Sequence, residues 1–266
     1  MDKRPIGVFD SGLGGLTVVR EIRQILPTED IVYLGDTARI PYGTRSRETV
    51  IKFALEDAQF LVKQNVKCLI IACNTASAFA KNAVKKSVQL PVFDVISAGS
   101  YDAVKKSKTK RIGVIGTRGT IGSQAYQSSI LKLDQSSSIF SYPCPLFVPF
   151  IEEGEIKGKL IQNLVDRYLT PFKDKHIDTL VLGCTHYPII EPLIKRRFNK
   201  VTLVNPGEFL AKKLSKFLAQ HDLLNRKGNK GKMQYFVTDL TDRFVTVAGM
   251  FLGEKIEGRI NKINLT

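Results

Sequence analysis

Two cysteines of this chain stand directly after predicted buried strands and directly before polar residues. Cys73 follows CLIIA and precedes Asn-Thr, and Cys184 follows TLVLG and precedes Thr-His. Ligand sites in open α/β sheets lie beyond the carboxyl ends of the strands, which is where both thiols are expected. A thiol has a reference pKa of about 8.5, so near neutral pH it can serve as an acid or, once ionised, as a base. Two thiols facing one carbon centre from opposite sides could remove a proton at one face and deliver another at the other, as racemisation requires.

The other two cysteines are predicted to be structural. Cys68 lies inside its strand and Cys144 stands beside two prolines, so both are expected to be small buried hydrophobic residues. No close CxxC pair occurs and the three histidines are scattered, so no metal site is predicted. The first residues lack the apolar core of a signal peptide. We therefore expect a cytoplasmic protein without a disulfide framework.

Composition limits the class of protein. Hydrophobic residues make up 43% of the 266 residues, as in folded globular chains. No apolar run reaches the roughly 18 residues that a membrane helix needs. The net charge of +15 would suit a nucleic-acid-binding protein, but the basic residues are spread along the chain without the interleaved aromatic residues of a single-strand-binding surface. We therefore expect neither membrane nor nucleic-acid binding; a basic surface would also attract an anionic substrate such as a dicarboxylate.

Short apolar runs alternate with amphipathic stretches, which is typical of βα units around parallel sheets. The predicted strands are 6–10, 31–36, 68–72, 92–97, 111–117, 179–183, 201–205 and 233–239. The predicted helices run from the SGLGG turn to about 25, and over 46–64, 74–86, 121–133, 158–172, the residues after Pro188, and 208–219. The stretch 100–110 (SYDAVKKSKTK) is expected to be a hinge-like connection.

The two halves of the chain echo each other. IIACNTA and LVLGCTHYP each place a cysteine and polar residues at the end of a strand, and VFDSG and VIGTRGT are strand-then-turn segments at a similar offset. This pattern predicts an α/β fold of two related domains with mainly parallel sheets facing a central cleft. The first domain is expected to comprise residues 1–97 plus 208–266, and the second residues 98–207.

Five blocks of the chain resemble glutamate racemases of the aspartate/glutamate racemase superfamily: DSGLGGLTVVREI, YLGDTARIPYGTRS, IIACNTAS, CPLFVPFIEEG and VLGCTHYP. The resemblance extends from Gly7 to about Glu208. It implies two α/β domains around a central cleft and interconversion of L- and D-glutamate without pyridoxal phosphate or another cofactor. It also implies that the product D-glutamate supplies bacterial peptidoglycan, and we expect a homodimer.

The resemblance also implies roles for individual residues. Cys73 would exchange the proton of the D-enantiomer and Cys184 that of the L-enantiomer. The side chains expected to support these thiols are those of Asp10, His186, Glu152 and Asp36. The residues expected to contact substrate are Asp10, Ser11, Tyr42, Gly43, Asn74, Thr75, Thr185 and His186. Asp10 can hold an ammonium, the hydroxyl and amide groups can bind carboxylates, and Gly43 would allow a close backbone N–H.

Simpler interpretations of several residues stay open. Asp10 and Ser11 could be an ordinary helix cap, and the following glycines could cradle a phosphate, although they lack the spacing of a P-loop. Glu152 and its neighbour Glu153 could be a solvated pair, and Asp36 could be a turn residue. The chain also has VISAGSYDAV where many glutamate racemases have an acidic-proline-glycine run, and VNPGE where a serine-bearing version is common.

Two rival functions follow from the same sequence. An enzyme of the same superfamily that acts on aspartate, a hydantoin or maleate would share the cysteines and differ in its pocket. A basic module that binds nucleic acid or regulates another protein would not need the thiols, but no groove-reading motif occurs in the chain.

Overall fold

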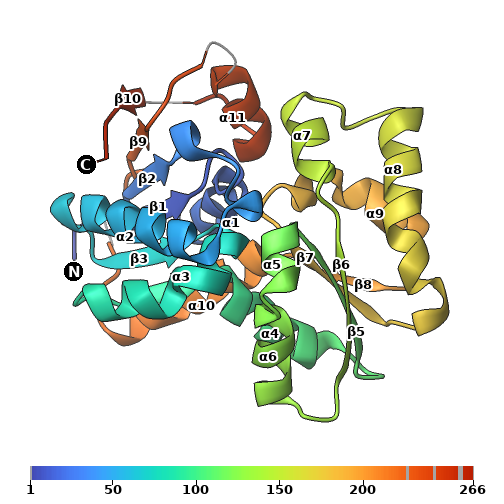
Figure 1. The fold of residues 1–266 in the computed structure, drawn as a ribbon. Helices are drawn as coiled ribbons and strands as arrows, with labels where there is room; N and C mark the ends of the chain where they lie inside the picture. The colour runs from blue at the N-terminus through green and yellow to red at the C-terminus, as the bar shows by residue number, and fades with distance from the viewer. Residues whose placement is uncertain (1, 226–227, 242–243, 257–259, 266) are drawn as a thin grey trace.

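The structure, a computed structural model, describes residues 2–225, 228–241, 244–256 and 260–265. Two lobes are each built on a parallel sheet (Figure 1). The first sheet has the order β10-β9-β2-β1-β3-β4, and its strands are β1 (Ile6–Asp10), β2 (Ile31–Gly35), β3 (Cys68–Ile71), β4 (Val92–Asp94), β9 (Met233–Val237) and β10 (Ile260–Lys262). The second sheet has the order β6-β5-β7-β8, and its strands are β5 (Arg111–Gly116), β6 (Ser138–Pro143), β7 (Thr179–Gly183) and β8 (Thr202–Val204).

All the described strand pairings are parallel, which confirms the predicted α/β class. In register, Ile6 of β1 pairs with Ile31 of β2 and with Cys68 of β3, so three apolar runs lie side by side. These strands are buried along their whole length, as expected for parallel strands covered on both faces by helices. Strand β9 adds to β2 from a distant part of the chain, so the C-terminal segment returns to the first lobe (Figure 1).

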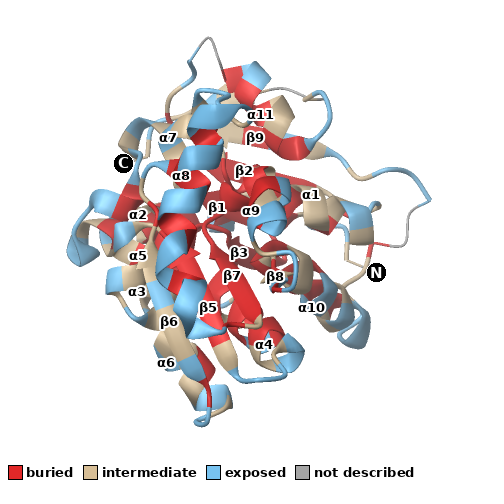
Figure 2. Ribbon diagram, turned by 90° about the vertical axis from the view of Figure 1, so that its right-hand side faces the viewer, coloured by how far each residue is buried: buried red, intermediate tan, exposed pale blue. Residues whose placement is uncertain are grey.

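Helices cover both sheets, with buried strands between helices whose outer faces are exposed (Figure 2). Those of the first lobe are α1 (Leu16–Ile25), α2 (Arg47–Lys63), α3 (Asn74–Ser87), α10 (Pro206–Gln220) and α11 (Phe244–Leu252). Those that follow β4 or belong to the second sheet are α4 (Val95–Lys106), α5 (Arg118–Gly122), α6 (Ala125–Leu133), α7 (Phe147–Glu152), α8 (Lys159–Leu169) and α9 (Glu191–Arg197). Among the helices of the described residues, none combines the length and apolar character needed to cross a membrane.

The segment expected to be a strand at 92–97 and a hinge at 100–110 is mostly helix, so both predictions were wrong there. Strand β4 stops at Asp94, whose Oδ1 accepts a hydrogen bond of 2.8 Å from the backbone N–H of Ser97 and caps α4. Helix α4 then packs against β7 of the second sheet and against α10 of the first lobe, so it connects the two lobes. The expected boundary at 97/98 falls inside α4, and the domain boundaries stay a prediction.

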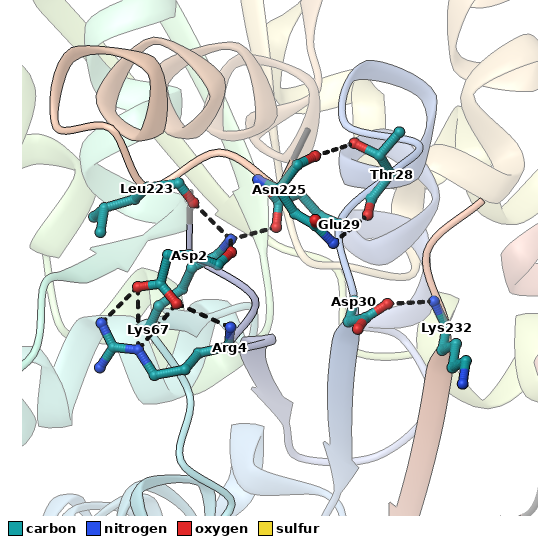
Figure 3. Close-up of polar contacts among 9 residues, drawn as sticks. All are labelled: Asp2, Arg4, Thr28, Glu29, Asp30, Lys67, Leu223, Asn225 and Lys232. Carbon is teal, nitrogen blue, oxygen red and sulfur yellow. Dashed lines mark hydrogen bonds and ion pairs between the residues drawn. The ribbon is translucent and has the colours of Figure 1, made fainter. Parts of the chain in front are cut away.

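A buried ion pair joins three segments at the amino ends of the first sheet's strands (Figure 3). Both Lys67 and Glu29 have fully buried side chains, and they contact each other directly. Lys67 Nζ also donates to the backbone oxygen of Leu223 at 2.8 Å, and Glu29 Oε1 accepts from the backbone N–H of Asn225 at 2.8 Å. The pair therefore ties the chain that leaves α10 to the loops that precede β2 and β3, at the end of the sheet opposite its carboxyl ends.

Candidate active site

The two cysteines singled out from the sequence lie at the carboxyl ends of strands in different lobes. In the first lobe, Asp10 ends β1 and Cys73 follows the adjacent strand β3. In the second lobe, Thr117 follows β5 and Cys184 follows the adjacent strand β7. The predicted placement of both thiols at strand ends is therefore correct.

Cys73 is held at the start of α3, with a side chain that is almost buried. Its sulfur accepts a hydrogen bond from the backbone N–H of Ala76 at 3.4 Å and lies 3.5 Å from Ser11 Oγ. Burial raises the pKa of Cys73 to about 12, and the neighbouring Asp10 carboxylate and Cys184 add to this increase. At neutral pH, Cys73 is therefore a thiol, the form that can donate a proton.

Cys184, His186 and Glu152 contact one another in that order. Its sulfur lies 3.7 Å from His186 Nδ1, and His186 Nε2 lies 2.9 Å from Glu152 Oε1. Burial lowers the pKa of His186, but its hydrogen bonds and charge interactions with Cys184 and Glu152 outweigh burial and raise this pKa to about 10. His186 is therefore an imidazolium at neutral pH, which places a cation beside the sulfur of Cys184. The two thiols thus have opposite electrostatic surroundings.

Direct contacts hold the two thiol-bearing lobes together. Asp10 is fully buried, and its Oδ1 lies 3.5 Å from Thr185 Oγ1, while Thr17 Oγ1 donates to the Thr185 carbonyl at 2.8 Å. Gly14 makes this approach possible, because a Cβ there would lie 2.3 Å from Thr185 Oγ1 and 2.5 Å from His186 Nδ1. Burial raises the pKa of Asp10, partly offset by His186.

One cavity of about 330 Å³ is lined by direct neighbours of both thiols, whereas Cys73 and Cys184 themselves lie behind its described lining. Its wall includes Ser11, the neighbour of Cys73, and His186 and Glu152, the partners on the Cys184 side. The remaining lining residues are Gly12, Ile40, Pro41, Gly43, Thr44, Thr117, Arg118, Pro145, Val148 and Pro149. Residues of both lobes therefore form a single site large enough for a small substrate.

Two expected site residues lie behind this wall. Asp36 is fully buried, and its Oδ2 contacts the Tyr42 hydroxyl and accepts from Arg39 Nε at 2.6 Å. The Tyr42 hydroxyl also lies 3.1 Å from Asp57 Oδ2, so this side chain is engaged away from the cavity. Gly43, in the turn at Tyr42–Thr44, therefore lines the cavity, whereas the Asp36 side chain lies behind that turn.

Other expected contacts are arranged through residues that the sequence analysis did not single out. Asn74 Oδ1 accepts a hydrogen bond of 2.7 Å from the Tyr126 hydroxyl of the second lobe. Thr75 Oγ1 lies 3.0 Å from Thr117 Oγ1 and 3.1 Å from Thr120 Oγ1, so three hydroxyls meet between the lobes. Thr117 and Thr120 belong to the TRGT segment that follows a predicted strand, and this position could have indicated them. No feature of the neighbouring sequence indicated that Tyr126 contacts Asn74.

The other two cysteines are fully buried, as predicted for structural thiols, and neither lines the cavity. Cys68 lies within β3, and burial raises its pKa to about 12. Cys144 is also fully buried, and its sulfur lies 3.7 Å from the carbonyl of Tyr142. Among the residues that the structure describes, no three histidine, cysteine or acidic side chains gather as a possible metal site.

Two parallel-sheet lobes around one shared cavity are the fold of two-domain α/β racemases. The family described as Asp/Glu/Hydantoin racemase matches residues 6–214. The chain belongs to this family and is therefore an isomerase.

Individual relatives are similar over their whole length. The glutamate racemase of Aquifex aeolicus is 44% identical over 255 residues, which is 96% of each chain. The crystal structure of glutamate racemase from Francisella tularensis in complex with D-glutamate is 44% identical, with a TM-score of 0.94 over 100% of this chain and 99% of that one. A glutamate racemase isoform of Bacillus anthracis is 38% identical with a TM-score of 0.95 over the same shares.

Proposed function

We propose that this protein interconverts L- and D-glutamate by a two-thiol mechanism that needs no cofactor. The observation that carries the proposal is the pair of thiols from different lobes beside one cavity, Cys73 through Ser11 and Cys184 through His186. The choice of glutamate is supported by the 44% identical relative that was solved with D-glutamate.

Cys73 lies near the Asp10 carboxylate and Cys184 near the His186 imidazolium, and this difference supports a role for each thiol as proton donor or acceptor. For L-glutamate, the Cys184 thiolate takes the α-proton: the C–H bond breaks, an S–H bond forms, and the electron pair stays on the α-carbon next to the carboxylate. The Cys73 thiol then delivers its proton to the opposite face, forming D-glutamate and leaving Cys73 as the thiolate. The reverse reaction uses Cys73 as base and Cys184 as acid.

The remaining polar residues would hold the substrate and tune the thiols. Asp10 supplies a buried carboxylate beside Cys73 to balance the substrate ammonium, which stabilises carbanion character at the α-carbon. Glu152 holds His186 charged beside Cys184. The donors available to the substrate carboxylates are Ser11, Asn74, Thr75, Thr185, His186 and the backbone of Gly43. Asp36 and Tyr42 would act by supporting the turn that carries Gly43.

Circular dichroism of L-glutamate mixed with the purified protein, without pyridoxal phosphate, tests the activity. The optical signal should decay to zero, and retention of the signal would refute glutamate racemisation. A parallel panel of aspartate, a hydantoin and maleate distinguishes glutamate from the substrates of rival superfamily members.

Cysteine variants test the mechanism. Cys73→Ser and Cys184→Ser should each abolish racemisation, whereas Cys68→Ala, which alters a thiol buried inside β3, should retain it. In D₂O, Cys73→Ser is expected to exchange the α-proton of L-glutamate alone, and Cys184→Ser that of D-glutamate alone. Normal racemisation by either catalytic variant would exclude the two-thiol mechanism.

The proposed cellular role is to supply D-glutamate for peptidoglycan synthesis from the cytoplasm, as a homodimer. Depletion of the protein should then be rescued by external D-glutamate and not by L-glutamate. Sedimentation of the purified protein tests the dimer, and a mass of one chain at micromolar concentration would contradict it.

A further inference from the structure

A buried polar cluster lies behind the turn that forms part of the cavity wall. At its centre is the hydroxyl of Tyr42, which contacts Asp36 Oδ2 and lies 3.1 Å from Asp57 Oδ2. Both carboxyl groups are fully buried, and Asp57 belongs to helix α2. Arg39 joins the cluster, since its Nε donates to Asp36 at 2.6 Å and its Nη1 pairs with Glu56. Two buried carboxyl groups therefore share one hydroxyl.

The number of hydrogen atoms at the Tyr42 oxygen limits the charge of this cluster. Burial and the two neighbouring carboxyl groups raise the pKa of Tyr42 far above its usual value, so at neutral pH it is a phenol with a single O–H hydrogen. The phenol can donate that hydrogen to one carboxylate, and it can bond to a second carboxyl group only by accepting a hydrogen from it. One of the two carboxyl groups must therefore carry a proton.

The other donors around the two carboxyl groups assign this proton to Asp57. Asp36 Oδ1 accepts from Thr238 Oγ1 at 2.9 Å, and its Oδ2 accepts from Arg39 Nε at 2.6 Å. Asp57 has, apart from the phenol, a contact of 3.4 Å between its Oδ1 and Arg39 Nη2 among the described residues. Burial raises the pKa of Asp57 well above its usual range, the Asp36 carboxylate adds to this increase, and Arg39 offsets part of it. Asp36 is therefore the ionised partner and Asp57 the neutral one.

We propose that Asp57 is a positioning residue that stays protonated and donates a hydrogen bond to the Tyr42 hydroxyl, which in turn donates to Asp36. These hydrogen bonds hold the turn at Tyr42–Thr44 from behind. The turn forms part of the cavity wall through Gly43 and packs against α5 of the second lobe. The effect on turnover rests on the proposed racemisation, whereas the protonation of Asp57 does not depend on it.

Infrared spectroscopy of the purified protein at neutral pH tests the protonation directly, because a protonated carboxyl group has a carbonyl stretch distinct from the bands of carboxylates. The difference spectrum between the wild type and Asp57→Asn should contain this band, and D₂O should shift it. Glu56→Gln is the matched control, because it replaces the neighbouring carboxyl group of α2, which is paired with Arg39. This control should keep the band. A difference spectrum for Asp57→Asn that shows the loss of a carboxylate band instead would overturn the proposal.

Steady-state kinetics test the positioning role, because asparagine and leucine are close to aspartate in size and only asparagine can donate to the phenol. We expect KM for glutamate to be about five-fold higher for Asp57→Leu than for Asp57→Asn, with kcat values within about two-fold, which is the effect of losing one net hydrogen bond. In a Tyr42→Phe background, the two variants should no longer differ.

Equal KM values for Asp57→Asn and Asp57→Leu in the protein that retains Tyr42 would overturn the positioning role. The infrared measurement needs only the wild type, Asp57→Asn and Glu56→Gln, so it decides the protonation even if Asp57→Leu does not fold. Absence of racemisation by the wild-type protein would instead refute the proposed function, and the infrared band would still test the proton on Asp57.

Discussion

Replacing Lys67 by methionine removes the ammonium group of a fully buried ion pair and leaves the Glu29 carboxylate without its cation (Figure 3). Methionine keeps most of the aliphatic stem, so the main loss is the charge and the hydrogen bond to the Leu223 carbonyl. The carboxylate would retain the backbone N–H of Asn225 as a donor. Removing one partner of a buried pair costs about 3–5 kcal/mol of unfolding free energy.

The corresponding shift in melting temperature is large. At roughly 2–4 °C per kcal/mol for a chain of this size, the variant should melt on the order of 10 °C below the wild type. Glu29→Gln combined with Lys67→Met removes both charges and keeps an acceptor for the Asn225 N–H. This double variant should recover at least about 2 kcal/mol relative to the sum of the single changes, because no unpaired charge stays buried.

Urea denaturation followed by far-ultraviolet circular dichroism at pH 7 measures these differences. At urea concentrations where Lys67→Met is still folded, its racemase activity should stay near that of the wild type. The Lys67–Glu29 pair lies at the amino ends of the strands, whereas the cavity lies at their carboxyl ends. The reasoning is refuted if Lys67→Met costs less than about 1 kcal/mol, or if the double variant is as unstable as the two single changes added together.

Three further predictions concern the site. Gly14→Ala should abolish activity, because the new Cβ would lie 2.3 Å from Thr185 Oγ1 of the opposite lobe. Gly122→Ala, with nothing within 4 Å of its Cβ, should stay active, and equal rates for both variants would contradict the close approach of Gly14 to Thr185. The pKa of His186 is raised from 6.5 to about 10, so its contribution to stability is complete below about pH 6.5 and is lost as the pH rises to about 10. Melting temperatures measured across that interval should fall more for the wild type than for His186→Gln. An equal fall for both proteins would exclude this contribution of His186. Tyr126→Phe removes the hydrogen bond to Asn74, so the free energy of unfolding should fall by about 1 kcal/mol and KM should rise a few-fold, and an unchanged KM would remove Asn74 from the binding groups.

The parallel α/β class and the position of both thiols were predictable because they depend on local features. Apolar runs such as 6–10, 68–71 and 179–183 must be buried as strands, and the polar residues after Cys73 and Cys184 then lie at strand ends. The segment after β4 was mispredicted because its first residues are apolar enough for a strand, and only the cap at Asp94 turns them into α4.

The sequence by itself determined the central strands of both sheets and the position of the two thiols at strand ends, since burial of apolar runs and the ends of strands are set by neighbouring residues. Tertiary structure alone decided that Glu152 contacts His186, that Tyr126 holds Asn74, and that Asp36 supports a turn behind the cavity. These contacts join residues whose separation along the chain says nothing of their distance in space. Of the three, the contact of Tyr126 with Asn74 also requires that the two sheets pack with their carboxyl ends toward each other.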